Sequence, residues 1–151
     1  MKFIKYIFLI LLIFSCNDSN SDNSETSELD GVWIGTLINI PYPNEFTFIF
    51  NDNYLEINGF YDIDGIDLPI TATGSFTLNN DLDPNQMDLT LISYTMNGDS
   101  ITEYLGLVSL CIYQIDGDIL SFSGAEPGTT RRPSDFSGDE GEMQVYILTR
   151  D

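Results

Sequence analysis

The sequence predicts an all-β protein, folded as a single antiparallel up-and-down β-barrel of about eight strands. Short apolar segments rich in β-branched and aromatic residues recur at close spacing, with Gly, Pro, Asn and Asp between them. No window shows sustained helical periodicity. The aromatic content of 13%, with ten Phe and eight Tyr, suits a barrel interior, and closing the barrel removes exposed sheet edges.

The expected strands are bounded by recognisable turn chemistry. Asn97-Gly98-Asp99 and Asp116-Gly117-Asp118 are typical of tight hairpin turns. The Asp-rich segment 61–68 is predicted to be a loop. Within 104–113 the apolar run could also form a short helix, but its β-branched residues and nearby glycines favour a strand. The expected strands are 32–40, 46–50, 54–60, 70–78, 87–95, 101–115, 119–123 and 143–150.

The N-terminal residues are typical of an export signal. Lys2 and Lys5 precede an apolar run that ends at a small residue, Ser15, followed by Cys16. This run is too short to span a bilayer, so 1–15 is predicted to be a signal peptide. Residues 13–16 resemble a bacterial lipobox, which implies cleavage before Cys16 and its acylation. An ordinary signal peptide beside an unrelated Cys is the alternative, and the polar run after Cys16 favours lipidation.

The remaining chain divides into a tether and one domain. Residues 16–28 comprise the lipidated Cys16 and a disordered acidic tether, since 17–28 contains no apolar residue. Residues 29–151 form the β-barrel domain. The expected location is the bacterial cell envelope, in the outer membrane, with the domain facing the periplasm or the cell surface. Asp18, Asp22 and Glu25 are compatible with surface export.

The charge excludes some partners. The chain has 24 Asp and Glu against 5 Lys and Arg, a net charge of -19. A surface this acidic repels phosphate backbones, so no nucleic-acid partner is expected. It also repels anionic lipid head groups. Membrane attachment is therefore expected through acyl chains on Cys16.

The residues for common catalytic chemistry are missing. The chain has no His, no nucleophile-elbow motif, no phosphate loop and no zinc-ligand spacing. Cys111 stands in an apolar run, so we expect a buried, unreactive thiol and no disulfide with Cys16. We therefore predict a protein that is not an enzyme and that needs no cofactor.

Two acidic clusters are weak candidates for a Ca²⁺ site. Carboxylates at alternate positions suit a hard cation. The second cluster lacks the Gly and the bidentate Glu that an EF-hand loop requires, and the first lacks a Glu at a useful offset. Solvated loops are therefore the preferred interpretation, and no metal is predicted. The candidates are Asp62, Asp64, Asp67, Asp81 and Asp83.

Two sets of residues resemble known barrel families. Gly31-Val32-Trp33 at the first strand and Arg150 at the last are similar to the lipocalin pattern, in which an Arg packs over the Trp and closes the barrel. The segments 112–120 and 132–136 resemble a lipocalin-like domain of exported bacterial proteins, known first from planctomycetes. The resemblance covers about residues 29–151 and implies a lipocalin-like barrel. It implies no activity, because that family has none assigned.

Arg131 and Arg132 stand out in so acidic a chain. Arg132 could bind a carboxylate or backbone carbonyls and pin the loop that contains Pro133 and Phe136. Alternatively, the arginines could hold an anionic ligand group at the barrel mouth. Loop pinning is the preferred interpretation.

The expected function is non-catalytic binding of a small apolar or amphipathic ligand in the barrel, or of a protein partner at its rim. One alternative is a structural or stress-related envelope protein with a solid-packed barrel. A carboxylate-based hydrolase or a Ca²⁺-binding module is a weaker alternative. A cavity would favour ligand binding, whereas two inward acids within about 5–10 Å would favour hydrolysis.

Overall fold

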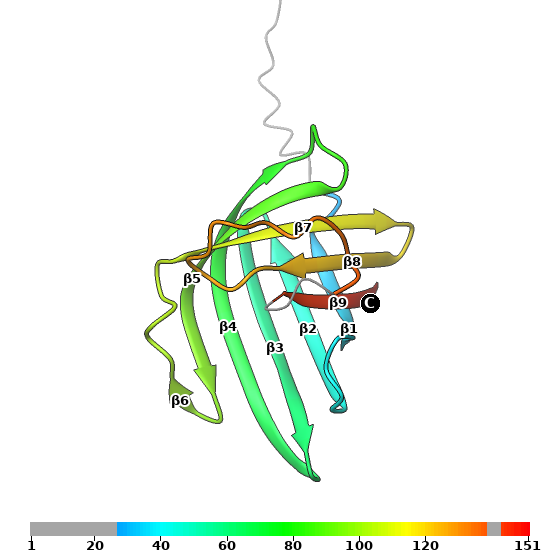
Figure 1. Ribbon diagram of the computed structural model, residues 1–151. Helices are drawn as coiled ribbons and strands as arrows, with labels where there is room; N and C mark the ends of the chain where they lie inside the picture. The colour runs from blue at the N-terminus through cyan, green and yellow to red at the C-terminus, as the bar shows by residue number, and fades with distance from the viewer. Residues whose placement is uncertain (1–26, 139–142) are drawn as a thin grey trace, which may run out of the picture.

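The structure, a computed structural model, describes residues 27–138 and 143–151. These residues form a closed antiparallel barrel of eight strands plus one short extra strand (Figure 1). Neighbouring strands pair around the wall, and the pairing of β4 with β5 completes the circle. The predicted fold class is confirmed. The predicted signal peptide, Cys16 and nearly all of the tether lie outside the described residues.

The strands follow the chain in up-and-down order. They are β1 (Gly31–Leu37), β2 (Asn44–Asn51), β3 (Tyr54–Ile63), β4 (Ile66–Asn79), β5 (Asn85–Met96), β6 (Asp99–Ser100), β7 (Val108–Asp116), β8 (Ile119–Gly124) and β9 (Gln144–Arg150). β6 pairs only with the end of β5. Residues 32–40 were expected to form one strand, but β1 ends at Leu37.

Inward side chains alternate with outward side chains along the strands, and the inward ones form the core. In β2, Phe46, Phe48 and Phe50 are buried, whereas the residues between them are half-buried. Successive side chains of a strand point to opposite faces, so all three rings enter the barrel. They meet inward side chains of the opposite wall, and Phe48 lies 5.6 Å from Phe122 between ring centroids.

Two hairpin turns are as predicted. Asn97 and Gly98 have φ values of 53° and 84° and join β5 to β6. Gly117, with φ 61°, lies in the turn that joins β7 to β8. Positive φ is readily adopted by Gly and tolerated by Asn, which explains both turns.

The prediction of a loop at 61–68 is wrong. β3 continues to Ile63 and β4 begins at Ile66, with only Asp64 and Gly65 between them, at φ 57° and 80°. Tyr61 pairs with Leu68. The apolar residues of this segment alternate with its Asp residues. A hairpin with a two-residue turn therefore places the apolar side chains on one face of the ribbon and the paired Asp62 and Asp67 on the other.

The prediction of one strand over 101–115 is also wrong, because only Val108–Asp116 is extended. Residues 101–107 instead cross the free edge of β5. Ile101 N–H donates to the Tyr94 carbonyl and Gly106 N–H donates to the Leu91 carbonyl, each at 2.9 Å. Gly106 has φ 76°, a left-handed conformation that interrupts an extended strand.

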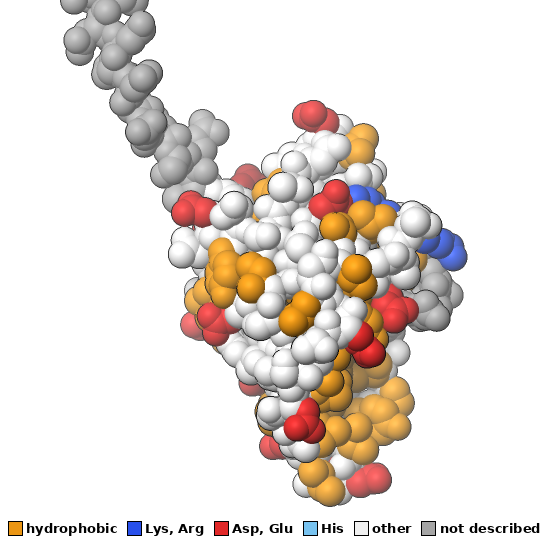
Figure 2. Space-filling model, turned by 90° about the vertical axis from the view of Figure 1, so that its left-hand side faces the viewer, with side chains coloured by type: hydrophobic (Ala, Val, Ile, Leu, Met, Phe, Trp, Pro, Cys, Tyr) orange, Lys and Arg blue, Asp and Glu red, His pale blue; other side chains and the backbone are white. Residues whose placement is uncertain are grey.

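One end of the barrel is extended by the β3–β4 hairpin. β7 pairs with β5 only as far as Thr90, so the rest of β5 projects with β3 and β4 beyond the other strands. Figure 2 shows hydrophobic side chains gathered over this lower part of the molecule. Ile66 is 64% exposed there, and Ile63 and Leu68 are half-buried. The open end of the barrel therefore has one apolar, partly exposed wall.

Candidate functional site

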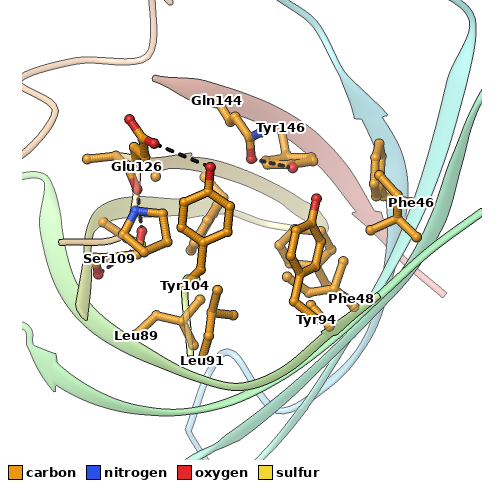
Figure 3. A pocket seen from close by; sticks show the side chains of 18 of the residues that line it. Phe46, Phe48, Leu89, Leu91, Tyr94, Tyr104, Ser109, Glu126, Gln144 and Tyr146 are labelled. Carbon is orange, nitrogen blue, oxygen red and sulfur yellow. Dashed lines mark hydrogen bonds between the residues drawn. The ribbon is translucent and has the colours of Figure 1, made fainter. Parts of the chain in front are cut away.

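A cavity of about 320 Å³ lies in the barrel interior (Figure 3). The strands of the extended wall, β3, β4 and β5, form part of its lining. Residues from seven strands and from two connecting segments surround the cavity. The lining residues are Phe46, Phe48, Ile57, Tyr61, Ile70, Ala72, Leu89, Leu91, Tyr94, Tyr104, Ser109, Cys111, Phe122, Gly124, Ala125, Glu126, Pro127, Gln144 and Tyr146.

Small residues on three strands and the following loop explain why the cavity is not filled. Ala72 on β4 and Ser109 on β7 face it, and Gly124 and Ala125 stand at the end of β8. A larger side chain at these positions would project into the space. Ser109 Oγ donates a hydrogen bond to the Ala125 carbonyl at 2.5 Å, so its own polar atom is satisfied in the wall.

Aromatic side chains form the deep part of the cavity. The ring of Tyr146 lies 5.0 Å from Phe48 and 5.2 Å from Phe46, measured between centroids. Gly59 makes room for Phe46, since a Cβ on Gly59 would lie 2.3 Å from that ring. Edge-to-face and tilted packing of this kind gives a rigid apolar surface.

Polar groups collect at the mouth instead. Tyr104 Oη donates to Glu126 Oε1 at 3.4 Å, and Tyr146 Oη donates to Gln144 Oε1 at 2.9 Å. The carboxylates of Glu103 and Glu126 raise the pKa of Tyr104, because a phenolate beside them would be repelled. Burial raises the pKa of Tyr146 well above its usual value. Both phenols are therefore neutral at physiological pH.

The thiol of Cys111 lines the cavity but is not a nucleophile. Cys111 is fully buried and free, and burial raises its pKa to about 12. Its Sγ lies 3.4 Å from Ser109 Oγ. The thiolate is the reactive form of cysteine, so this side chain is inert at neutral pH. The expected burial of Cys111 is confirmed.

Trp33 and Arg150 meet at the opposite end of the barrel, as expected. The Arg150 guanidinium lies 4.1 Å from the centroid of the Trp33 ring. It also donates to the carbonyls of Asp30 and Glu28, at 2.9 and 2.7 Å. Gly31 has φ 126°, and a Cβ there would stand 3.3 Å from the guanidinium. These residues close the barrel.

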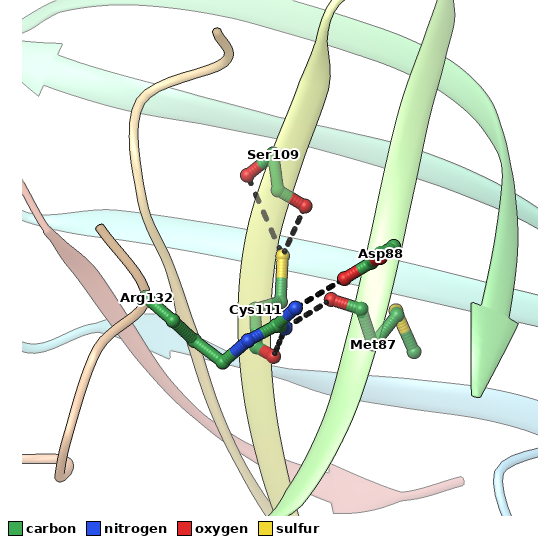
Figure 4. Close-up of polar contacts among 5 residues, drawn as sticks. All are labelled: Met87, Asp88, Ser109, Cys111 and Arg132. Atoms are coloured by element: carbon green, nitrogen blue, oxygen red, sulfur yellow. Dashed lines mark hydrogen bonds and ion pairs between the residues drawn. The ribbon is translucent and has the colours of Figure 1, made fainter. Parts of the chain in front are cut away.

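Arg132 pins the loop that follows β8 (Figure 4). Its Nη1 donates to the carbonyls of Met87 and Cys111, at 2.9 and 2.6 Å, and its Nη2 pairs with Asp88. Met87 and Cys111 are opposite one another on β5 and β7. The guanidinium therefore joins the loop to the seam between these strands, which is the preferred sequence interpretation.

The neighbouring candidates lie on the same loop and do not line the cavity. Pro133 is buried, Phe136 is half-buried and Arg131 is exposed. The alternative that these arginines hold an anion inside the barrel mouth is not supported by their placement.

The acidic candidates remain dispersed. Asp62 accepts a hydrogen bond from Gly65 N–H at 2.7 Å and thereby stabilises the β3–β4 turn. Within 27–138 and 143–151, no three His, Cys, Asp or Glu side chains gather as a metal site. The structure thus does not bring Asp64 and Asp67, or Asp81 and Asp83, into a common ligand set.

Sequence reasoning missed the residues at the mouth. Tyr94, Tyr104, Glu126 and Gln144 belong to four separate segments and to no motif. One signal was present, because alternate connections of an up-and-down barrel lie at the same end. The connections after β5 and after β8, described over 97–107 and 125–138, are two such connections, so their side chains could have been expected near one another.

Comparison of the chain with protein-family models, with curated proteins and with solved structures found no match. The described residues include no helix of the length and apolar character required to cross a membrane.

Proposed function

We propose that this protein is a non-catalytic, lipid-anchored protein of the bacterial cell envelope that holds a small apolar or amphipathic molecule in its barrel. The cavity of about 320 Å³ carries this proposal. It falls in the range of small-molecule sites, about 300–1,000 Å³, and combines an apolar interior with a few polar groups. A barrel packed solid for a structural role would have no such space.

The chemistry of the lining favours binding over catalysis. Among the described residues, Glu126 is the single carboxylate that lines the cavity, whereas Glu103, which also acts on Tyr104, is exposed and is not a lining residue. Hydrolysis by paired carboxylates needs two facing acids about 5–10 Å apart. Cys111 is the other potential reactive group, and its raised pKa keeps it protonated.

Native mass spectrometry of the protein purified from its own envelope is expected to show a reproducible extra mass that denaturation removes. Ala72→Phe should abolish it, because the ring would fill the cavity from β4. The same variant should bind 1-decanol, a neutral probe, at least about tenfold more weakly by calorimetry. For calorimetry, the parent chain and Ala72→Phe would both be prepared as residues 16–151 with Cys16→Ser, since every strand in the described part of the chain lies between Gly31 and Arg150.

Thr71→Phe is the matched control. Thr71 precedes Ala72 on β4 but is exposed on the outer face, where its hydroxyl contacts Thr95. Decanol binding should be unchanged in this variant. Equal binding by Ala72→Phe and the parent chain would show that the cavity is not the binding site.

The anchor is tested separately. The N-terminal peptide of the native protein should begin at Cys16 and carry a diacylglyceryl mass on that residue. Cys16→Ser should remove this lipid mass, because the hydroxyl does not replace the acceptor thiol. A native N-terminus at another residue, without lipid, would contradict the lipoprotein assignment while leaving the binding proposal intact.

A further inference from the structure

The sign of the charge at the cavity mouth restricts what the cavity can hold. Glu126 is the one acidic residue among the described lining residues, and no Lys or Arg accompanies it. Glu103 adds a second carboxylate near Tyr104. Arg150 and Arg132 contact other parts of the barrel. Arg150 caps Trp33 at the far end, and Arg132 pins the β5–β7 seam.

An anionic head group would therefore meet repulsion at this mouth. No Lys or Arg within 27–138 and 143–151 lines the cavity to compensate it, and the whole chain carries a net charge of -19. Two like charges about 4 Å apart repel each other more strongly near a protein surface than in bulk water, because the effective dielectric constant there is lower. A carboxylate or phosphate beside Glu126 is thus disfavoured, whereas a cation there is favoured.

Aromatic rings add to this preference. The centroids of Tyr94 and Tyr104 are 6.2 Å apart, with the ring planes inclined by 55°. Figure 3 shows the two rings side by side, their hydroxyls directed toward the same side of the mouth as Glu126 and Gln144. The faces of phenol rings attract cations within about 6 Å of their centroids.

Glu126 also retains hydrogen-bonding capacity. Its Oε1 accepts one long bond from Tyr104, at 3.4 Å. A carboxylate has about four lone-pair sites, so most remain open to a ligand. The side chain is half-buried, and its field is therefore only partly screened by water.

We propose that the molecule held in the barrel is a cationic amphiphile, with an ammonium group between Glu126 and the rings of Tyr94 and Tyr104. Its apolar part extends inward along Phe48, Leu89 and Phe122. This inference rests on the proposed function and names the chemical class of its ligand.

Three probes with ten-carbon chains and different head groups test it. Decyltrimethylammonium, 1-decanol and decanoate would be titrated into residues 16–151 carrying Cys16→Ser, by calorimetry at neutral pH and low salt. The ammonium should bind tightest and decanoate weakest. Decanol or decanoate binding as tightly as the ammonium would overturn the inference and leave the binding function standing. No binding by any of the three would overturn both.

A charge-removing variant identifies the carboxylate. Glu126→Gln should weaken ammonium binding by about tenfold and change decanol binding by less than about twofold. Glu45→Gln is the matched control, because it removes the same charge from an exposed position on β2, beside the lining residue Phe46. Equal losses in the two variants would show a general charge effect and overturn the assignment to Glu126. Decanol binding also reports that each variant is folded.

Discussion

Truncating Trp33 to alanine is expected to destabilise the barrel by about 4 kcal/mol, the largest effect of any single change considered. Trp33 is fully buried, and its Nε1–H donates to the Leu29 carbonyl at 2.7 Å. The Arg150 guanidinium covers its ring. The variant would lose the packing, leave the Leu29 carbonyl unpaired and remove the surface on which Arg150 lies. The free energy of unfolding of a small domain is only about 5–15 kcal/mol, so this loss would be a large part of the total.

Urea denaturation followed by far-ultraviolet circular dichroism measures this effect, since Trp33 is the single tryptophan of the chain and the variant has no indole fluorescence. Trp33→Phe should cost about half as much, because it keeps most of the packing and loses the hydrogen bond. Ile34→Ala is the matched control on the outer face of β1, where Ile34 is 36% exposed. A loss no larger than that of Ile34→Ala would contradict the role assigned to Trp33.

Replacing Arg132 with methionine is expected to destabilise the protein by about 3 kcal/mol. Methionine keeps the aliphatic packing but removes the hydrogen bonds from the guanidinium to the Met87 and Cys111 carbonyls. The ion pair with Asp88 contributes less, because the Asp88 side chain is 48% exposed. The loss should therefore come mainly from the two charge-assisted hydrogen bonds at the β5–β7 seam.

Two variants separate these contributions in the same denaturation experiment. Asp88→Asn removes only the carboxylate charge and should cost less than about 1 kcal/mol. Arg131→Met makes the same charge change at an exposed neighbouring position and should also cost less than about 1 kcal/mol. If Asp88→Asn proved as damaging as Arg132→Met, the ion pair and not the carbonyl bonds would hold the loop.

Local signals explain why most of the barrel could be predicted. Alternation in β2 and the turn at Asn97-Gly98 depend only on neighbouring residues, so the sequence carries them directly. The errors arose where local signals conflicted. Asp62 and Asp67 suggested a loop by composition, yet they are paired on a continuous hairpin. The apolar run after Ile101 suggested a strand, but the N–H groups of Leu105 and Leu107 donate to carbonyls three residues earlier in the same segment, so the segment turns.

The two ends of the barrel differed in how far they could be predicted. Trp33 and Arg150 belong to a recognisable pattern, and the register of β1 with β9 places them opposite one another. The cavity has no such pattern. It exists because small residues such as Ala72 and Gly124 face the interior from distant strands. Which inward positions lie at the same depth depends on barrel register, and register is set by all the strand pairings together.

The segment 101–107 gives the barrel a further property. Its backbone hydrogen bonds cover the part of β5 that β7 does not reach, and the same segment carries Tyr104 to the mouth. Moving Tyr104 aside to admit a large molecule would uncover main-chain donors and acceptors along β5. An uncovered strand edge is a template for pairing with another chain. Displacement of Tyr104 and exposure of the β5 edge are therefore coupled, so a mouth that stays closed by Tyr104 disfavours edge-to-edge pairing of two copies of the protein.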